Sequence, residues 1–169
     1  MTFDTARKLV EEQGIEFFLC SFVEMSGASK AKVVPAAHLD SMAAEGAGFA
    51  GFAAGDIGQG PHDPDMASIP DFDSLTVLPW RPNIAWVAGN VHVDGAEWPY
   101  CPRTILRRQL EIAGEKGFTV NVGVEAEFML LKRSENGEYL PWDALDTLGR
   151  PCYDLRALHR NLDVMTTLI

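Results

Sequence analysis

The stretch Glu16-Phe-Phe-Leu-Cys-Ser-Phe-Val23 decides the fold class of the N-terminal part of the chain. Aromatic and aliphatic side chains dominate it and no charge follows Glu16, which is typical of a largely buried β-strand. The turn-forming run Met25-Ser-Gly-Ala28 comes next, and Lys30–Val34 resumes a strand-like pattern. Two strand-like runs joined by a short turn predict a β-hairpin.

Short helices are predicted on both sides of this hairpin. Apolar residues recur at helical spacing in Phe3–Gln13, and Gly14 is suited to ending that helix. Pro35 stands at the start of a second helix, Ala36–Glu45, where a proline sacrifices no hydrogen bond. A hairpin combined with local helices indicates an α+β fold.

The segment Gly46–Asp73 is rich in Gly and Pro. Loops of this length without regular structure are usually functional or disordered. Its apolar residues favour an ordered loop that packs against another surface: Phe49, Phe52, Ile57 and Met66.

Three more short strands are predicted at Leu75–Leu78, Ile84–Ala88 and Val91–Val93. A helix over Arg103–Lys116 follows the Pro-rich connector Trp98–Pro102, where we expect a domain boundary between residues 1–97 and residues 98–169. A last helix is predicted over Tyr153–Ile169. Its apolar end carries no polar cap, so we expect the chain to be part of a longer protein.

The composition excludes several classes of protein. The chain has 169 residues, 47% apolar and 22% charged, which is ordinary for a globular protein. Its 24 acidic residues outnumber 14 Lys and Arg, and the net charge of −10 makes nucleic acid and anionic membranes unsuitable partners. The chain has no signal-peptide pattern and no apolar run of about 18 residues. Three distant cysteines, without a Cys-x-x-Cys pair, predict reduced thiols in a cytoplasmic protein: Cys20, Cys101 and Cys152.

The candidate site lies within Phe118–Arg133, where apolar residues fill the even-numbered positions from Val120 to Leu130. This alternation predicts a long strand with Glu125 and Glu127 on its other face, their Cα atoms about 6.5–7 Å apart. Met129 and Leu131 continue the acidic face, so we expect it to be partly covered.

Two carboxylates on a partly covered face repel each other unless one takes up a proton or a cation neutralises both. Hard divalent ions such as Mg²⁺ and Mn²⁺ prefer oxygen ligands of this kind. The alternative is the water-facing side of an ordinary antiparallel sheet. The local pattern leaves both interpretations open.

An ordered set of motifs resembles the N-terminal part of the glutamine synthetase family. Gly123-Val-Glu-Ala-Glu-Phe-Met-Leu130 is similar to that family's Gly-x-Glu-x-Glu-Phe-x-Leu motif. Further stretches resemble family segments in the same order: Phe49-Ala-Gly51 with Pro64-Asp-Met66, Leu75-Thr-Val-Leu-Pro-Trp80, Cys101-Pro-Arg-Thr-Ile-Leu106 and Pro151-Cys-Tyr-Asp-Leu155. The pattern looks closest to the type III branch, whose members form γ-glutamylmethylamide.

The resemblance implies a small β-grasp-like N-terminal domain over residues 1–97, followed over 98–169 by the first helix, strand and helix of a catalytic domain. It implies an ATP-dependent ligase of nitrogen metabolism that joins glutamate to ammonia or a small amine through γ-glutamyl phosphate. The cofactor would be Mg²⁺ or Mn²⁺, with Glu127 on the ion nearer glutamate and Glu125 on the ion nearer the ATP phosphates. The family's other ligands lie downstream, so the chain alone is expected to be inactive.

The family forms homo-oligomeric rings in which a loop of one subunit reaches its neighbour's active site, and this assigns Gly46–Met66 to a subunit interface. Asp65 occupies the place of a loop aspartate near the amine site. Ala50 departs from the family, which has an ammonium-binding Asp there. Either another amine such as methylamine replaces ammonia, or Asp56 takes over the role. The alternative function is a non-catalytic β-grasp-type binding module.

Overall fold

The computed structural model of the chain describes residues 1–54, 59–150 and 152–168. It contains two compact units, Met1–Val120 and Asn121–Ile169, which are described separately below as the N-terminal and the C-terminal unit.

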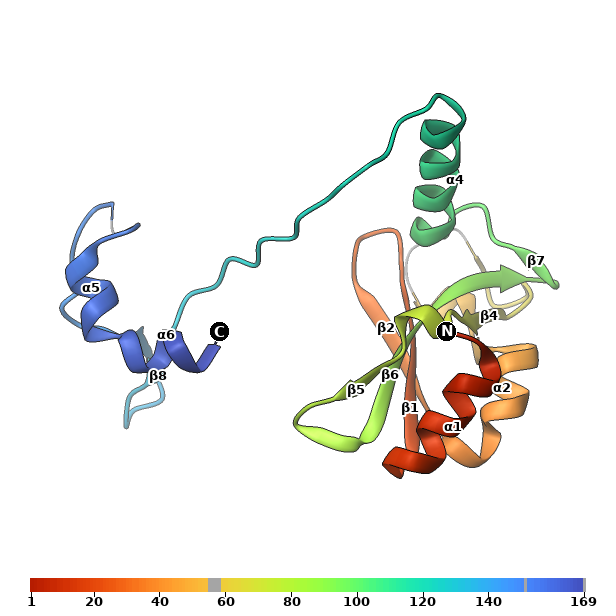
Figure 1. Ribbon diagram of the computed structural model, residues 1–169, viewed down its shortest axis with the longest axis horizontal. Helices are drawn as coiled ribbons and strands as arrows, with labels where there is room; N and C mark the ends of the chain where they lie inside the picture. The colour runs from red at the N-terminus through yellow and green to blue at the C-terminus, as the bar shows by residue number, and fades with distance from the viewer. Residues whose placement is uncertain (55–58, 151, 169) are drawn as a thin grey trace. The chain divides into compact units, whose positions relative to one another are not determined.

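A seven-stranded mixed sheet forms the centre of the N-terminal unit (Figure 1). Its strands are β1 (Phe17–Val23), β2 (Ser29–Pro35), β3 (Ala47–Phe49), β4 (Met66–Pro70), β5 (Thr76–Leu78), β6 (Arg81–Val93) and β7 (Ala96–Glu97). The main order is β2-β1-β6-β4-β3, and β5 and β7 also pair with β6. The β1–β6 ladder is parallel and the other ladders are antiparallel. The long strand β6 therefore joins both halves of the sheet.

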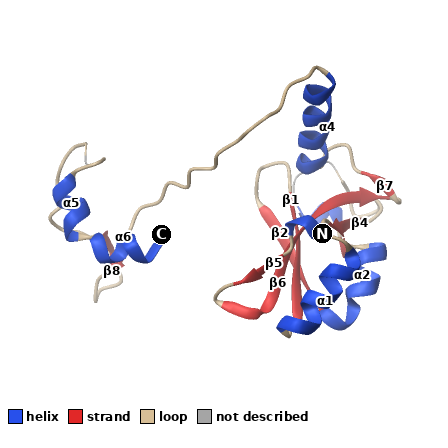
Figure 2. Cartoon of the chain, viewed as in Figure 1, coloured by secondary structure: helices blue, strands red, loops and turns tan. Residues whose placement is uncertain are grey.

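Helices and 3₁₀ turns complete this unit (Figure 2). The elements are α1 (Phe3–Gln13), a 3₁₀ turn at Ala36–His38, α2 (Leu39–Glu45), α3 (Gly51–Ala54), a 3₁₀ turn at Phe72–Ser74 and α4 (Pro102–Glu115). The Thr2 hydroxyl caps α1 by accepting from the backbone N–H of Thr5, and Gly14 ends the helix at a φ of 65°.

Two apolar clusters hold the N-terminal unit together. The larger packs α1 and α2 against the sheet and comprises Ile15, Phe18, Cys20, Leu39, Met42, Ala47, Ala85 and Val87. The smaller comprises Phe22, Ala54, Met66, Val91 and Cys101. Phe18, Cys20 and Phe22 alternate along β1 and therefore lie on one face of the strand. Phe18 and Cys20 belong to the larger cluster, and Phe22 belongs to the smaller one. The apolar run Glu16–Val23 thus contributes side chains to both clusters.

The predicted hairpin and first helix are confirmed, with β1 and β2 antiparallel and α1 covering Phe3–Gln13. The predicted loop Gly46–Asp73 is ordered where it is described, but it also contributes β3, α3 and β4, which the sequence analysis did not predict. Ile57 lies outside the described residues.

Predicting two separate strands at Ile84–Ala88 and Val91–Val93 was wrong, because β6 runs unbroken through both. Gly89 keeps the strand continuous where the backbone of β4 approaches: it faces Pro70 in the ladder and has Ser68 beside its Cα.

The C-terminal unit is a hairpin followed by two helices. Strands β8 (Leu131–Arg133) and β9 (Tyr139–Pro141) pair antiparallel, and Gly137 takes a φ of 85° in the turn between them. The helices are α5 (Leu155–Arg160) and α6 (Leu162–Leu168). Predicting one continuous helix over Tyr153–Ile169 was wrong, because Asn161 ends α5 outside the helical region. Among the described helices, none is both long and apolar enough to cross a membrane.

The predicted strand Phe118–Arg133 is wrong over residues 118–130, which we call the unpaired segment. It is drawn as an extended stretch after α4 (Figure 1), and only Leu131–Arg133 joins a ladder. Within the described chain, no backbone hydrogen bond links residues 119–129 to another residue. A strand requires a neighbour for its backbone groups, and no described strand offers one here.

The structure combines helices and strands, which confirms the mixed α and β content of the predicted α+β fold. The β-grasp-like description and the division into residues 1–97 and 98–169 stay predictions.

Gly89 provides a stability test. A Cβ at this position would lie 1.9 Å from Ser68 Oγ and 3.0 Å from the backbone oxygen of Ile69. We expect Gly89→Ala to lower the free energy of unfolding by about 1–3 kcal/mol, measured by urea denaturation. Gly48→Ala is the matched control, because a Cβ there meets no atom within 4 Å. Equal losses from the two variants would contradict the close packing of β4 on β6.

Candidate functional site

Glu125 and Glu127 lie in the unpaired segment, and both side chains are exposed. The prediction of a partly covered acidic face was wrong, because Met129 is 85% exposed and Leu131 is 49% exposed. The apolar face is open as well, with Val124 92% exposed. Water therefore screens the repulsion between the two carboxylates in this chain.

The donor set fits a hard divalent cation in kind but not in number. Two residues separated by one position in an extended backbone project to the same side, so both carboxylates can face one ion or two adjacent ions. Mg²⁺ requires six oxygen ligands, of which one or two carboxylates usually supply a minority. Among the described residues, no group of three or more His, Cys, Asp or Glu side chains is placed to hold a metal. The pair is therefore a partial ligand set.

The residues predicted near the amine lie in the N-terminal unit. Ala50 joins β3 to α3, and Asp65 is exposed immediately before β4. Ala50 lines a cavity of about 360 Å³ with Ser29, Lys30, Ala31, Phe49, Ala53 and Ala54. The described residues of this lining include a cation and no carboxylate. Asp56, the predicted substitute acid, lies outside the described residues.

The lysines of β2 were not predicted from the sequence as functional residues. Lys32 donates from Nζ to the backbone oxygen of Gly48 at 2.7 Å and lies 5.7 Å from the centre of the Phe49 ring. Lys30 lines the cavity beside Ala50. Their alternation in Lys30-Ala-Lys32 was the available signal, since alternate strand residues share a face. Strand β2 thus holds the start of the Gly-rich segment in place.

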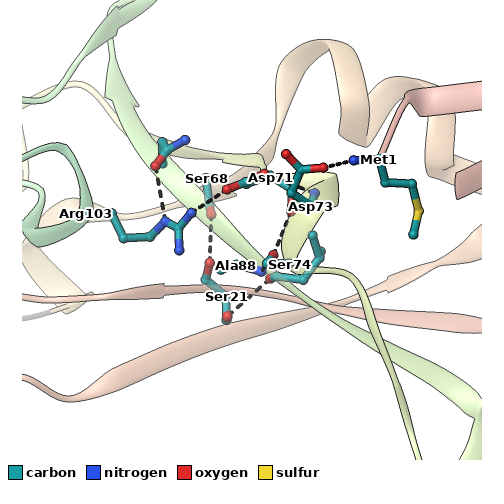
Figure 3. A network of polar contacts seen from close by, with 10 residues as sticks. Met1, Ser21, Ser68, Asp71, Asp73, Ser74, Ala88 and Arg103 are labelled. Carbon is teal, nitrogen blue, oxygen red and sulfur yellow. Dashed lines mark hydrogen bonds and ion pairs between the residues drawn. The ribbon is translucent and has the colours of Figure 1, made fainter. Parts of the chain in front are cut away.

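A polar network fixes the start of α4 on the sheet (Figure 3). Arg103 donates to Asp71 Oδ2 at 2.5 Å and from Nε to Asn90 Oδ1 at 3.2 Å. Asp71 in turn donates its backbone N–H to the Ala88 oxygen at 2.7 Å, and Ser74 Oγ accepts from the Ala88 N–H at 2.8 Å. The arginine of Cys101-Pro-Arg103 therefore anchors the helix that precedes the unpaired segment.

Asp143 organises the C-terminal unit. Its carboxylate accepts from Arg160 Nε at 2.9 Å, from Asn161 Nδ2 at 3.0 Å and from the backbone N–H of Leu145 at 2.9 Å. The pKa of Asp143 is lowered below its ordinary value. The largest cause is the hydrogen bond from the Arg160 side chain, and the next is the hydrogen bond from the Leu145 backbone N–H. One carboxylate thus ties the end of the β8–β9 hairpin to the end of α5.

The lowered pKa of Asp143 predicts a pH dependence. A carboxyl group with a lower pKa in the folded state stabilises that state above its ordinary pKa, and the contribution disappears as the pH falls through the folded-state value. We expect the backbone amides of α5 to lose protection from hydrogen exchange as the pH is lowered below the ordinary aspartate range. Asp143→Asn should show weak protection at neutral pH already.

Asp146→Asn is the matched control, because the Asp146 side chain is exposed and forms no hydrogen bond or ion pair with the described residues. If protection of α5 responds equally to both variants after correction for intrinsic exchange, Asp143 does not hold the unit together.

Comparison with known proteins places these features in context. A family model for the catalytic domain of glutamine synthetase matches residues 99–168. A glutamate–methylamine ligase from Methyloversatilis universalis is 39% identical over 92% of the chain. A glutamine synthetase from Rhizobium leguminosarum bv. phaseoli is 37% identical over 99%. The chain spans 35% of the length of the first relative and 38% of the second.

Solved structures agree with these matches. A structure described as apo GmaS without ligand has a TM-score of 0.77 and 38% identity, covering 96% of this chain and 38% of that one. A GmaS/ADP complex has a TM-score of 0.76 and 38% identity, covering 95% of this chain and 36% of that one. A glutamine synthase homologue, at a TM-score of 0.52 and 21% identity, supports the fold alone; it covers 60% of this chain and 27% of that one.

Proposed function

The chain belongs to the glutamine synthetase family, and from this membership we propose that it forms part of an ATP-dependent ligase that joins glutamate to a small amine. The resemblance read from the ordered motifs is confirmed by these matches. The proposed product is a γ-glutamylamide, formed through γ-glutamyl phosphate by a cytoplasmic enzyme.

The observation that carries the proposal is the carboxylate pair in Gly123-Val-Glu-Ala-Glu-Phe128. Both side chains are exposed and separated by one residue of extended backbone, so they are free to bind a cation that other groups complete. Glu127 would hold the ion nearer glutamate and Glu125 the ion nearer the ATP phosphates. A bound Mg²⁺ or Mn²⁺ supplies electrostatic stabilisation of phosphate charge during phosphoryl transfer.

The remaining ligands would come from sequence that the relatives have beyond the part this chain spans. We infer the same source for the neighbours of the unpaired segment, whose alternation suits a strand of the catalytic sheet. The start of the family match at residue 99 supports a catalytic part over 98–169, and the mixed sheet supports a β-grasp-like domain over 1–97.

The cavity beside Ala50 supports an amine other than ammonium. An ammonium ion needs a carboxylate for charge pairing, and the described lining offers Lys30 instead. The 39% identity to a glutamate–methylamine ligase favours methylamine as the substrate. The 37% identity to a rhizobial glutamine synthetase keeps ammonia as the second candidate. In a ring, Ala50 and Asp65 would belong to a loop that completes the site of the neighbouring subunit.

Replacing the metal ligands tests the site. In the longer protein with this N-terminal sequence, Glu125→Gln and Glu127→Gln should each lower kcat/KM by about 100-fold or more, because each removes a ligand charge from a catalytic ion. Glu138→Gln is the control, since Glu138 is an exposed acid of the same unit. Mn²⁺ binding, followed by electron paramagnetic resonance, should weaken for the first two variants and stay unchanged for the third.

The 169-residue chain alone should show no turnover, and steady ATP-dependent γ-glutamyl transfer by it would contradict the partial ligand set.

Amine choice is tested at Ala50. The wild-type enzyme should prefer methylamine over ammonia in kcat/KM. Ala50→Asp should raise kcat/KM for ammonia by about 10-fold, since a hydrogen bond to a charged group contributes roughly 1.5–3 kcal/mol. Ala53→Asp adds the same charge elsewhere in the cavity and should not reproduce the gain. A wild-type preference for ammonia would refute the assignment.

A further inference from the structure

Lys32 joins two strands that lie at opposite ends of the sheet. The main strand order places β2 at one end and β3 at the other. At the usual strand spacing, a flat sheet would hold these two strands about 19 Å apart. Lys32 of β2 nevertheless donates from Nζ to the backbone oxygen of Gly48 in β3 at 2.7 Å. The sheet is therefore curled so far that its two ends meet.

Contacts between β1 and β4 show the same curl. Strand β6 separates these two strands in the order, yet Ser68 of β4 donates from Oγ to the backbone oxygen of Ser21 in β1 at 3.2 Å (Figure 3). Cys20 also donates from Sγ to the backbone oxygen of Ser68 at 3.5 Å. All three residues are buried. The curl thus belongs to the core of the N-terminal unit, and the approach of β2 to β3 follows from it.

Strand β3 is held by few ladder contacts. It has three residues and, within the described chain, pairs with β4 alone. The ring of Phe49, its last residue, packs edge-on against Phe22 of β1, with ring centres 4.9 Å apart. Lys32 Nζ lies 5.7 Å from the centre of the Phe49 ring. One lysine side chain therefore fixes both the backbone and the aromatic ring at the end of β3, through a charge-assisted hydrogen bond and a cation–π contact.

The register of β3 with β4 brings the two residues predicted near the amine to the same end of the ladder. Phe49 faces Met66 in the last pair. Ala50 directly follows Phe49, and Asp65 directly precedes Met66. Consecutive Cα atoms are only about 3.8 Å apart, so a shift of the Gly48–Phe49 backbone passes directly to Ala50.

We propose that Lys32 is a positioning residue of the amine site. It acts through the Gly48 oxygen and the Phe49 ring, and so sets where Ala50 and Asp65 lie. The inference rests on the proposed ligase function, to which it adds a residue that determines how tightly the amine binds.

Hydrogen exchange tests the contact itself in the 169-residue chain. Lys32→Met keeps an unbranched stem but removes the charge and the donor. The backbone amides of Ala47–Phe49 should then exchange at least about 10-fold faster, because a hydrogen bond from a charged group is lost. Lys8→Met is the matched control, since Lys8 is an exposed lysine of α1. Unchanged exchange in β3, or equal acceleration in β1 and β6, would overturn the proposal.

Steady-state kinetics test the role in the longer protein with this N-terminal sequence. Lys32→Met should raise KM for the amine by about 10-fold, the effect expected from losing one hydrogen bond to a charged group. The values of kcat and of KM for glutamate and for ATP should stay within about two-fold of the wild type, because only binding of the amine is affected. Lys32→Arg keeps a charged donor and should recover amine binding.

The outcomes separate this inference from the proposed function. A fall in kcat, or an equal rise in KM for all three substrates, would overturn the positioning role, since a general loss of stability produces that pattern. An enzyme that forms no γ-glutamylamide with any amine would refute the proposed function, and the amine-site role with it. The exchange measurement would still decide whether Lys32 holds β3 in place.

Discussion

Backbone pairing along β6 is the constraint on which the N-terminal unit depends. This strand forms ladders with β1, β4, β5 and β7, whereas among the described residues β2 and β3 join the sheet through β1 and β4 alone. A buried backbone group without a hydrogen-bond partner costs about 1–3 kcal/mol. Each backbone hydrogen bond between β6 and a neighbouring strand avoids this cost, and together these bonds hold the neighbours in place. The position of β4, and with it the ordered part of the Gly-rich segment, follows from this one strand.

The same constraint explains the most informative difference between pattern and structure. The unpaired segment has the alternation of a strand, yet alternation creates only two faces and supplies no neighbour. Its carboxylates are therefore exposed, where water screens their charges and binding of a cation depends on additional ligands. A catalytic role for Glu125 and Glu127 thus requires the coverage and the ligands that the longer relatives have room to provide.

Two polar contacts connect the fold to the proposed activity. Arg103 binds Asp71 and Asn90 and so fixes the beginning of α4, the helix that leads to the carboxylate motif. Lys32 binds the Gly48 oxygen and so fixes the beginning of the segment that carries Ala50. Hydrogen bonds to charged groups are stronger than neutral ones, which suits them to orienting these two elements.

The sequence by itself determined the elements whose signals are local. The hairpin of β1 and β2 and the extent of α1 both follow from spacing and turn chemistry. Only the tertiary structure decided that Ile84–Ala88 and Val91–Val93 are one strand, that β4 lies beside it and that Asn161 divides the last helix. It also decided that the unpaired segment is exposed. These features depend on contacts between residues far apart in the sequence, because a hydrogen-bond partner or a covering side chain is supplied by another element and leaves no mark on the local pattern.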